Sequence, residues 1–116
     1  MVTATFRIGG IGTPQGVRDQ IPFAAIERGE VIVRSRLEPE APINDHLVWL
    51  WSGLKLKRRF LKRLQGDGAI FRCVCSVSRG PIHIQPNGAE MLHLLGAELI
   101  IETPSDRPYG SSSVSQ

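Results

Sequence analysis

The chain has no apolar run long enough to cross a bilayer, and it opens with neither a basic segment nor a long apolar segment followed by a cleavage site. These absences predict a cytoplasmic protein that does not associate with membranes. Cysteine is also scarce, since the chain has only Cys73 and Cys75. On an extended strand these two residues are too close to bridge each other without distortion. Two free thiols are compatible with a reducing compartment.

Signatures of catalysis and of cofactor binding are missing too. The glycines of GGIGTPQG, residues 9–16, match neither the dinucleotide-binding pattern nor the Walker A loop, so they predict a tight turn. The CxC pair lacks the usual spacing of a zinc site, although the chain has three histidines, His46, His83 and His93. We therefore expect a protein that is not an enzyme and that holds no cofactor and no metal. An enzyme would place its site near His83, Arg72 and Glu102.

The composition is typical of a single globular domain. The chain has 116 residues, of which 41% are hydrophobic and 22% are charged. Residues 1–103 are expected to form one domain. Residues 104–116 carry almost no apolar side chains, which predicts a flexible C-terminal tail.

Hydrophobic periodicity predicts the secondary structure along the chain. Alternating apolar residues indicate strands at 2–8, 30–37, 46–52, 69–78, 82–85 and 98–102, the fifth forming a hairpin with the fourth. Helical spacing and capping signals indicate helices at 14–21, 54–65 and 87–96, with Thr13 and Asn87 as N-caps and Gly96 as a stop. Free cysteines are expected to pack in the core, and Trp49 and Trp51 are expected to fill it rather than form a ligand platform.

This order predicts an α+β fold. The first six elements form the ferredoxin-like split arrangement β-α-β-β-α-β, and a further β-α-β unit extends it. A sheet of five or six strands would have its helices packed on one face.

Several segments together resemble the bacterial domain of unknown function family 4279. They are ATFRI, IPFAAIERGE, WLWS and GAEMLHLLGAELIIE, and the resemblance covers roughly residues 3–103. The chain departs from the family pattern in a shorter segment before AIFRC and in the basic helix that fills it. The resemblance implies a small bacterial domain without an assigned activity, and it brings no catalytic residues.

The stretch LKLKRRFLKRLQ, residues 54–65, holds six basic residues and no acid. These are Lys55, Lys57, Arg58, Arg59, Lys62 and Arg63. The rest of the chain has eight basic and eleven acidic residues, a net charge of −3. An apolar stripe of helical spacing runs through the same stretch and is expected to face the sheet. It consists of Leu56, Phe60, Leu61 and Leu64.

Charge segregation favours a non-enzymatic module that binds a macromolecule through these six cations, with an acidic protein surface as the preferred partner. Sequence-independent binding of nucleic acid through the same helix is the alternative, although the stretch lacks interleaved aromatic residues because Phe60 belongs to the apolar stripe. A plainly solvated helix face is the structural alternative. A small-molecule ligand is less favoured, and exposed sheet edges allow a homodimer.

Overall fold

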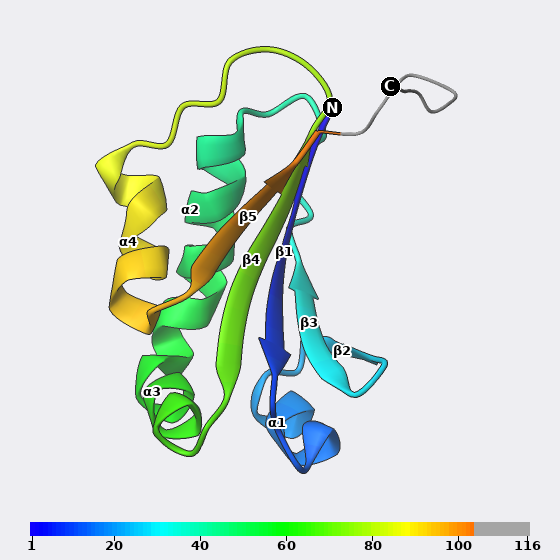
Figure 1. The fold of residues 1–116 in the computed structure, drawn as a ribbon, viewed down its shortest axis with the longest axis vertical. Helices are drawn as coiled ribbons and strands as arrows, with labels where there is room; N and C mark the ends of the chain where they lie inside the picture. Colours follow the sequence, from blue (N-terminus) through cyan, green and yellow to red (C-terminus); the bar gives the residue numbers. More distant parts are fainter. Residues whose placement is uncertain (104–116) are drawn as a thin grey trace, which may run out of the picture.

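A five-stranded mixed sheet is the frame of the computed structural model, which describes residues 1–103 (Figure 1). Its strands lie in the order β2-β3-β1-β4-β5. They span Val2–Gly9 (β1), Ala25–Glu27 (β2), Glu30–Arg34 (β3), Ile70–Val77 (β4) and Glu98–Glu102 (β5). All neighbouring strands are antiparallel except β4 and β5, which are parallel. The predicted tail at 104–116 lies outside the described residues.

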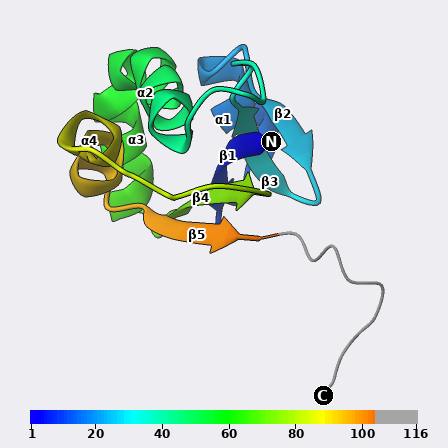
Figure 2. The same ribbon diagram turned by 90° about the horizontal axis from the view of Figure 1, so that it is seen from above.

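The helices gather on one side of this sheet, as Figure 2 shows from above. They span Pro14–Gln20 (α1), Ile43–Leu54 (α2), Arg58–Gly66 (α3) and Pro86–Leu95 (α4). A short 3₁₀ helix, η1 (Lys55–Lys57), joins α2 to α3 without a loop. We call this continuous stretch, residues 43–66, the helical rod. The opposite face of the sheet has no helix from the described residues on it, and we call it the open face.

Strand alternation places the core between the sheet and the helices. Phe6 of β1 and Phe71 of β4 are both buried, with ring centroids 5.5 Å apart. Cys73 and Cys75 are free and share their buried face, as the alternation in the sequence predicted. The mixed α+β class, the five strands and the helices on one face are therefore confirmed.

The prediction of a strand at 46–52 is wrong, because these residues lie in the middle of α2. Buried positions of α2 recur at helical spacing once the window is widened to both ends of the helix. They include Ile43, Leu47, Leu50, Trp51 and Leu54. Alternation of tryptophans with aliphatic residues over seven positions imitated a strand, because that window is too short to separate the two periods.

The predicted hairpin strand at 82–85 is also wrong. Residues 78–85 form an irregular, mostly exposed connection between the end of β4 at Val77 and the start of α4 at Pro86. The sheet contains one strand that the alternation did not indicate. This is β2, a three-residue strand paired with β3. The parallel addition of β5 beside β4 makes the sheet mixed.

The predicted helix at 54–65 is interrupted by η1. Leu61 is buried and Phe60 and Leu64 are half-buried, but Leu56 is 83% exposed. The tighter 3₁₀ turn changes the angle between successive side chains and removes Leu56 from the expected apolar stripe.

Asn44 of α2 joins α2 to α4. Its Oδ1 accepts a hydrogen bond from the backbone N–H of Gln85 at 2.8 Å, and its Nδ2 donates to Oδ1 of Asn87 at 3.0 Å. Asn87 is therefore not the N-cap that the sequence predicted, since α4 begins one residue earlier at Pro86, after Gln85. Thr13 and Gly96 do flank α1 and α4 as expected.

Candidate functional site

The six predicted cations lie together on the helical rod. Arg58, Arg59, Lys62 and Arg63 occupy positions i, i+1, i+4 and i+5 of α3, so they share one side of that helix. Lys55 and Lys57 precede them on η1. Five of the six are exposed and Lys57 is half-buried. We call these six residues the cationic side of the rod.

No carboxylate of residues 1–103 forms a salt bridge with any cation of the cationic side. The one side-chain hydrogen bond found there runs from Lys62 Nζ to Oε1 of Gln65, at 3.2 Å. An open hollow of about 710 Å³ lies among these side chains. Its lining consists of Arg58, Arg59, Lys62 and Arg63. The hollow is therefore a place where an anionic group meets several cations at once.

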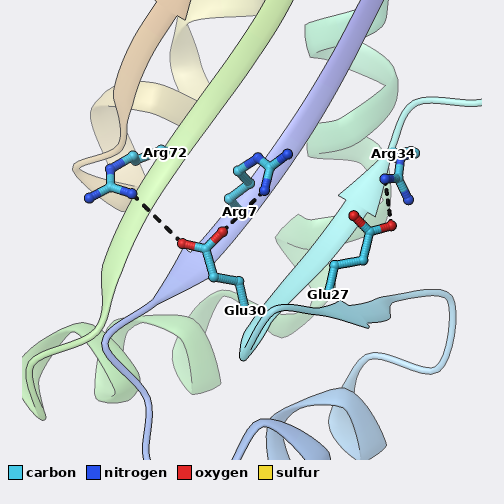
Figure 3. Close-up of polar contacts among 5 residues, drawn as sticks. All are labelled: Arg7, Glu27, Glu30, Arg34 and Arg72. Atoms are coloured by element: carbon cyan, nitrogen blue, oxygen red, sulfur yellow. Dashed lines mark hydrogen bonds and ion pairs between the residues drawn. The ribbon is translucent and has the colours of Figure 1, made fainter.

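Cations on the open face of the sheet, unlike those of the cationic side, are paired with carboxylates (Figure 3). The carboxylate of Glu30 lies between two arginines, with Oε1 3.1 Å from Arg7 and Oε2 3.7 Å from Arg72. Arg34 pairs with Glu27 at 2.6 Å. Charge on this face is consequently neutralised within the protein, whereas the charge of the cationic side is not.

The cationic side lowers the stability of the helix that holds it. Arg58 and Lys62 are four residues apart, as are Arg59 and Arg63, and like charges at this spacing cost about 0.2–0.5 kcal/mol per pair. The first turn of α3 has no acidic residue, and two arginines lie where the helix dipole favours negative charge. A bound anion would relieve both effects.

Two apolar side chains of the same rod are left wholly or partly in solvent. Leu56 is exposed among the cations, and Trp49 of α2 is only half-buried. Trp51 is buried in the core as expected, whereas Trp49 packs against the core but remains half-buried. Trp49 lines two separate hollows on the outer side of α2. The sequence does contain a signal for this, because Trp49 is four residues after Asp45 and three before Ser52, and so shares a side of α2 with these two exposed polar residues.

His46 is a buried polar residue away from the rod's outer side. Its Nδ1 lies 2.7 Å from Oγ of Ser35, and its buried Nε2 has no hydrogen-bond partner among the described residues. Burial lowers the pKa of His46 below its ordinary value of 6.5, and the backbone of Glu38 and the charge of Asp45 oppose this only in part. His46 is therefore buried, whereas its partner Ser35 is half-buried.

The other candidates from the sequence are not brought together. His83 lies in the connection after β4 and lines a hollow with Met1, Pro39 and Val77. Arg72 is opposite Glu98 on β5, whereas Glu102 is opposite Ser76. Between Met1 and Thr103 no group of three or more His, Cys, Asp or Glu side chains is placed to hold a metal ion. In the same residues no helix has the length and apolar character needed to span a membrane.

Neither a protein-family model, nor a curated protein, nor a solved structure matches the chain.

Proposed function

We propose that this protein is a non-enzymatic binding module whose cationic side recognises an acidic surface on another protein. One observation carries the proposal. Six cations on the rod have no carboxylate partner within residues 1–103, while Arg7, Arg34 and Arg72 on the open face are all paired. Unneutralised charge on one surface chiefly raises the association rate and the selectivity for partners of opposite charge.

An exposed aliphatic side chain supports a protein partner over nucleic acid. Leu56 lies among the cations and offers a contact that a protein surface can bury. Single-stranded nucleic acid is held by aromatic rings that stack on bases, whereas Phe60 is half-buried and packs against the core. Nucleic acid remains the second candidate because four cations around one hollow also suit a phosphate group.

The test compares two variants of equal net charge. Arg59→Glu with Lys62→Glu reverses two of the six cations of the cationic side, and Arg28→Glu with Arg79→Glu reverses two exposed cations elsewhere. Each tagged protein is used to recover partners from a bacterial lysate with and without nuclease. We expect a protein partner that survives nuclease, is lost with the first variant and is retained by the second. Equal recovery by both variants would refute the cationic side as the contact surface.

A solution measurement separates the two partner classes. Polyglutamate and a 20-residue oligothymidine are titrated against the protein at several salt concentrations. The proposal predicts tighter binding of polyglutamate. Binding of the oligonucleotide alone, with a steep fall as salt rises, would move the assignment to nucleic acid.

We further propose that β1 to β4 form a split β-α-β core of the ferredoxin-like kind and that the chain belongs with domain of unknown function family 4279. The strand order β2-β3-β1-β4 and the antiparallel pairing of these four strands support the first proposal. The segments ATFRI and GAEMLHLLGAELIIE support the second. The cytoplasm is the proposed compartment, and the two free buried thiols support it.

A further inference from the structure

Trp49 separates two hollows on the outer side of α2. The first has a volume of about 370 Å³ and lies between Trp49 and Phe23, with Arg36 at its border. The second has a volume of about 410 Å³ and is lined by Leu37 and Val48, among others. Both also contact Ser52, so the two hollows adjoin along one surface of the helix. Volumes of this size are typical of ligand-binding clefts.

The first hollow is built to accept an apolar group. Phe23 is 43% exposed and lines this hollow together with Trp49. Gly53 also lines the hollow, and a Cβ atom at this position would lie 3.5 Å from Cζ of Phe23, an ordinary contact distance. Because residue 53 has no side chain, the hollow stays open beside the ring of Phe23. An apolar group placed there would contact both rings.

This hollow and the cationic side follow one line along the rod. Trp49 and Gly53 are at positions i and i+4 of α2, which share a side of that helix, and Leu56 follows on η1. Arg59 and Arg63 continue on α3 beyond Leu56. With a rise of about 1.5 Å per residue, these two cations lie roughly 15–21 Å from Trp49 along the rod.

We propose that the outer side of the rod docks one segment of an acidic protein, with a large apolar side chain in the hollow between Trp49 and Phe23 and carboxylates on Arg59, Lys62 and Arg63. This rests on the proposed function and adds the chemistry and spacing of the partner. An extended chain advances about 3.3–3.6 Å per residue. The apolar anchor is therefore separated from the carboxylates by about four to six residues.

Charge and shape together select this occupant. The cations need carboxylates, and the hollow needs a group without charge that can fill the space between two rings. Arg36 at the border of the hollow has no carboxylate partner among the described residues, so it adds a contact for a further acidic group near the anchor. A segment that carries both the apolar anchor and the carboxylates would also cover Leu56, which lies between the two contacts.

Synthetic peptides test the spacing directly. Each carries one phenylalanine, a Gly-Ser spacer of one, five or ten residues, and four glutamates, and a matched set has alanine in place of phenylalanine. Binding is measured by calorimetry at low salt. We expect the five-residue spacer to give the tightest binding, about tenfold tighter than its alanine analogue. The one-residue spacer should lose this advantage because it cannot reach both places.

Substitutions at Gly53 provide a matched pair of protein variants. Gly53→Met fills the hollow, whereas Gly53→Ala adds one methyl group at an ordinary contact distance and serves as the control. The first should bind phenylalanine and alanine peptides equally, and the second should keep the preference. Phe23→Ser gives an independent variant, since its ring is already partly in solvent. Melting temperatures establish that each variant is folded.

The outcomes separate this inference from the function on which it rests. Equal binding of phenylalanine and alanine peptides by the unaltered protein would overturn the anchor and leave recognition of acidic surfaces intact. Binding that does not depend on spacer length would overturn the proposal that one segment contacts the hollow and the cations at the same time. Loss of all peptide binding in Arg59→Glu with Lys62→Glu, with the phenylalanine preference abolished only by Gly53→Met and Phe23→Ser, would support both. Failure of every peptide to bind would overturn both.

Discussion

Gly88 of α4 packs directly against the side-chain oxygen of Asn44 on α2, leaving no room for a Cβ atom. The same oxygen accepts the hydrogen bond from the backbone of Gln85 just before α4. Close approach of the two helices and the start of α4 are therefore fixed at one point. A glycine is required there for space, since the backbone of residue 88 is helical.

Gly88→Ala is expected to destabilise the protein by about 1–3 kcal/mol, because the methyl group forces Asn44 away from Gln85. Chemical denaturation measures the change. Gly16→Ala in α1 is the matched control, since its Cβ meets Oγ1 of Thr13 at an ordinary 3.6 Å and helix propensity then favours alanine by about 0.5–1 kcal/mol. Equal effects of the two substitutions would contradict the close packing at Gly88.

Glu30→Gln should cost about 1 kcal/mol, because it leaves Arg7 and Arg72 without their shared carboxylate in a partly buried position. Glu27→Gln breaks a more exposed pair with Arg34 and should cost less than about 0.5 kcal/mol. Urea unfolding of both variants gives the comparison. A larger effect at Glu27 would mean that burial does not set the strength of these pairs.

Arg59→Glu should raise stability while it weakens binding. An acid in the first turn of α3 complements the helix dipole and replaces the repulsion with Arg63 by attraction, a gain of about 0.3–1 kcal/mol. Affinity for polyglutamate should fall at the same time. Thermal unfolding and titration on one preparation measure both, and a variant that is both less stable and unchanged in affinity would refute the electrostatic account of the rod.

Stability should decline in mild acid because of His46. Burial lowers the pKa of this imidazole in the folded protein, so below its ordinary value of 6.5 the unfolded chain binds a proton that the folded protein does not. The contribution is constant above that pH. It falls by at most about 1.4 kcal/mol per pH unit as the pH decreases from 6.5 toward the lowered pKa. The unfolding midpoint should depend less on pH in His46→Gln than in the unaltered protein across this range. The same pH dependence in both proteins would assign the effect to other groups.

Thiol labelling should report unfolding. Cys73 and Cys75 are buried with their sulfur atoms 3.9 Å apart, and the hydrogen bond between them, together with burial, raises the pKa of Cys73. A neutral, inaccessible thiol reacts poorly. A chromogenic disulfide reagent should therefore modify neither cysteine quickly in buffer and both in denaturant. Rapid labelling without denaturant would show that β4 opens locally.

Strands and helices with an unambiguous period could be predicted from the sequence. Phe71, Cys73 and Val77 alternate over a complete strand, α1 begins at Pro14 after Thr13, and α4 ends before Gly96. The segment around Trp49 could not be assigned in the same way. Its tryptophans and β-branched neighbour fit a strand over seven positions, and the helical spacing is visible only over the whole of Ile43–Leu54.

The candidate site was predictable in composition but not in arrangement. Six cations in a short stretch are visible in the sequence, yet their lack of partners depends on where Glu27, Glu30 and Glu98 lie in space. The exposure of Leu56 follows from one 3₁₀ turn that no residue signals clearly. The hollow at Gly53 depends on Phe23, which is thirty positions away in the chain.

The separation of paired and unpaired charge makes ionic strength act on this protein in two directions. Added salt weakens long-range attraction between the cationic side and an acidic partner, since the screening length is about 10 Å at 0.1 M. It also relieves repulsion among the neighbouring cations of α3, whereas the Glu30 pairs, closer and partly sheltered, respond less. High salt therefore stabilises the folded chain and at the same time weakens binding of its acidic partner. An anion bound in the hollow would reduce the repulsion among these cations at low salt, as added salt does.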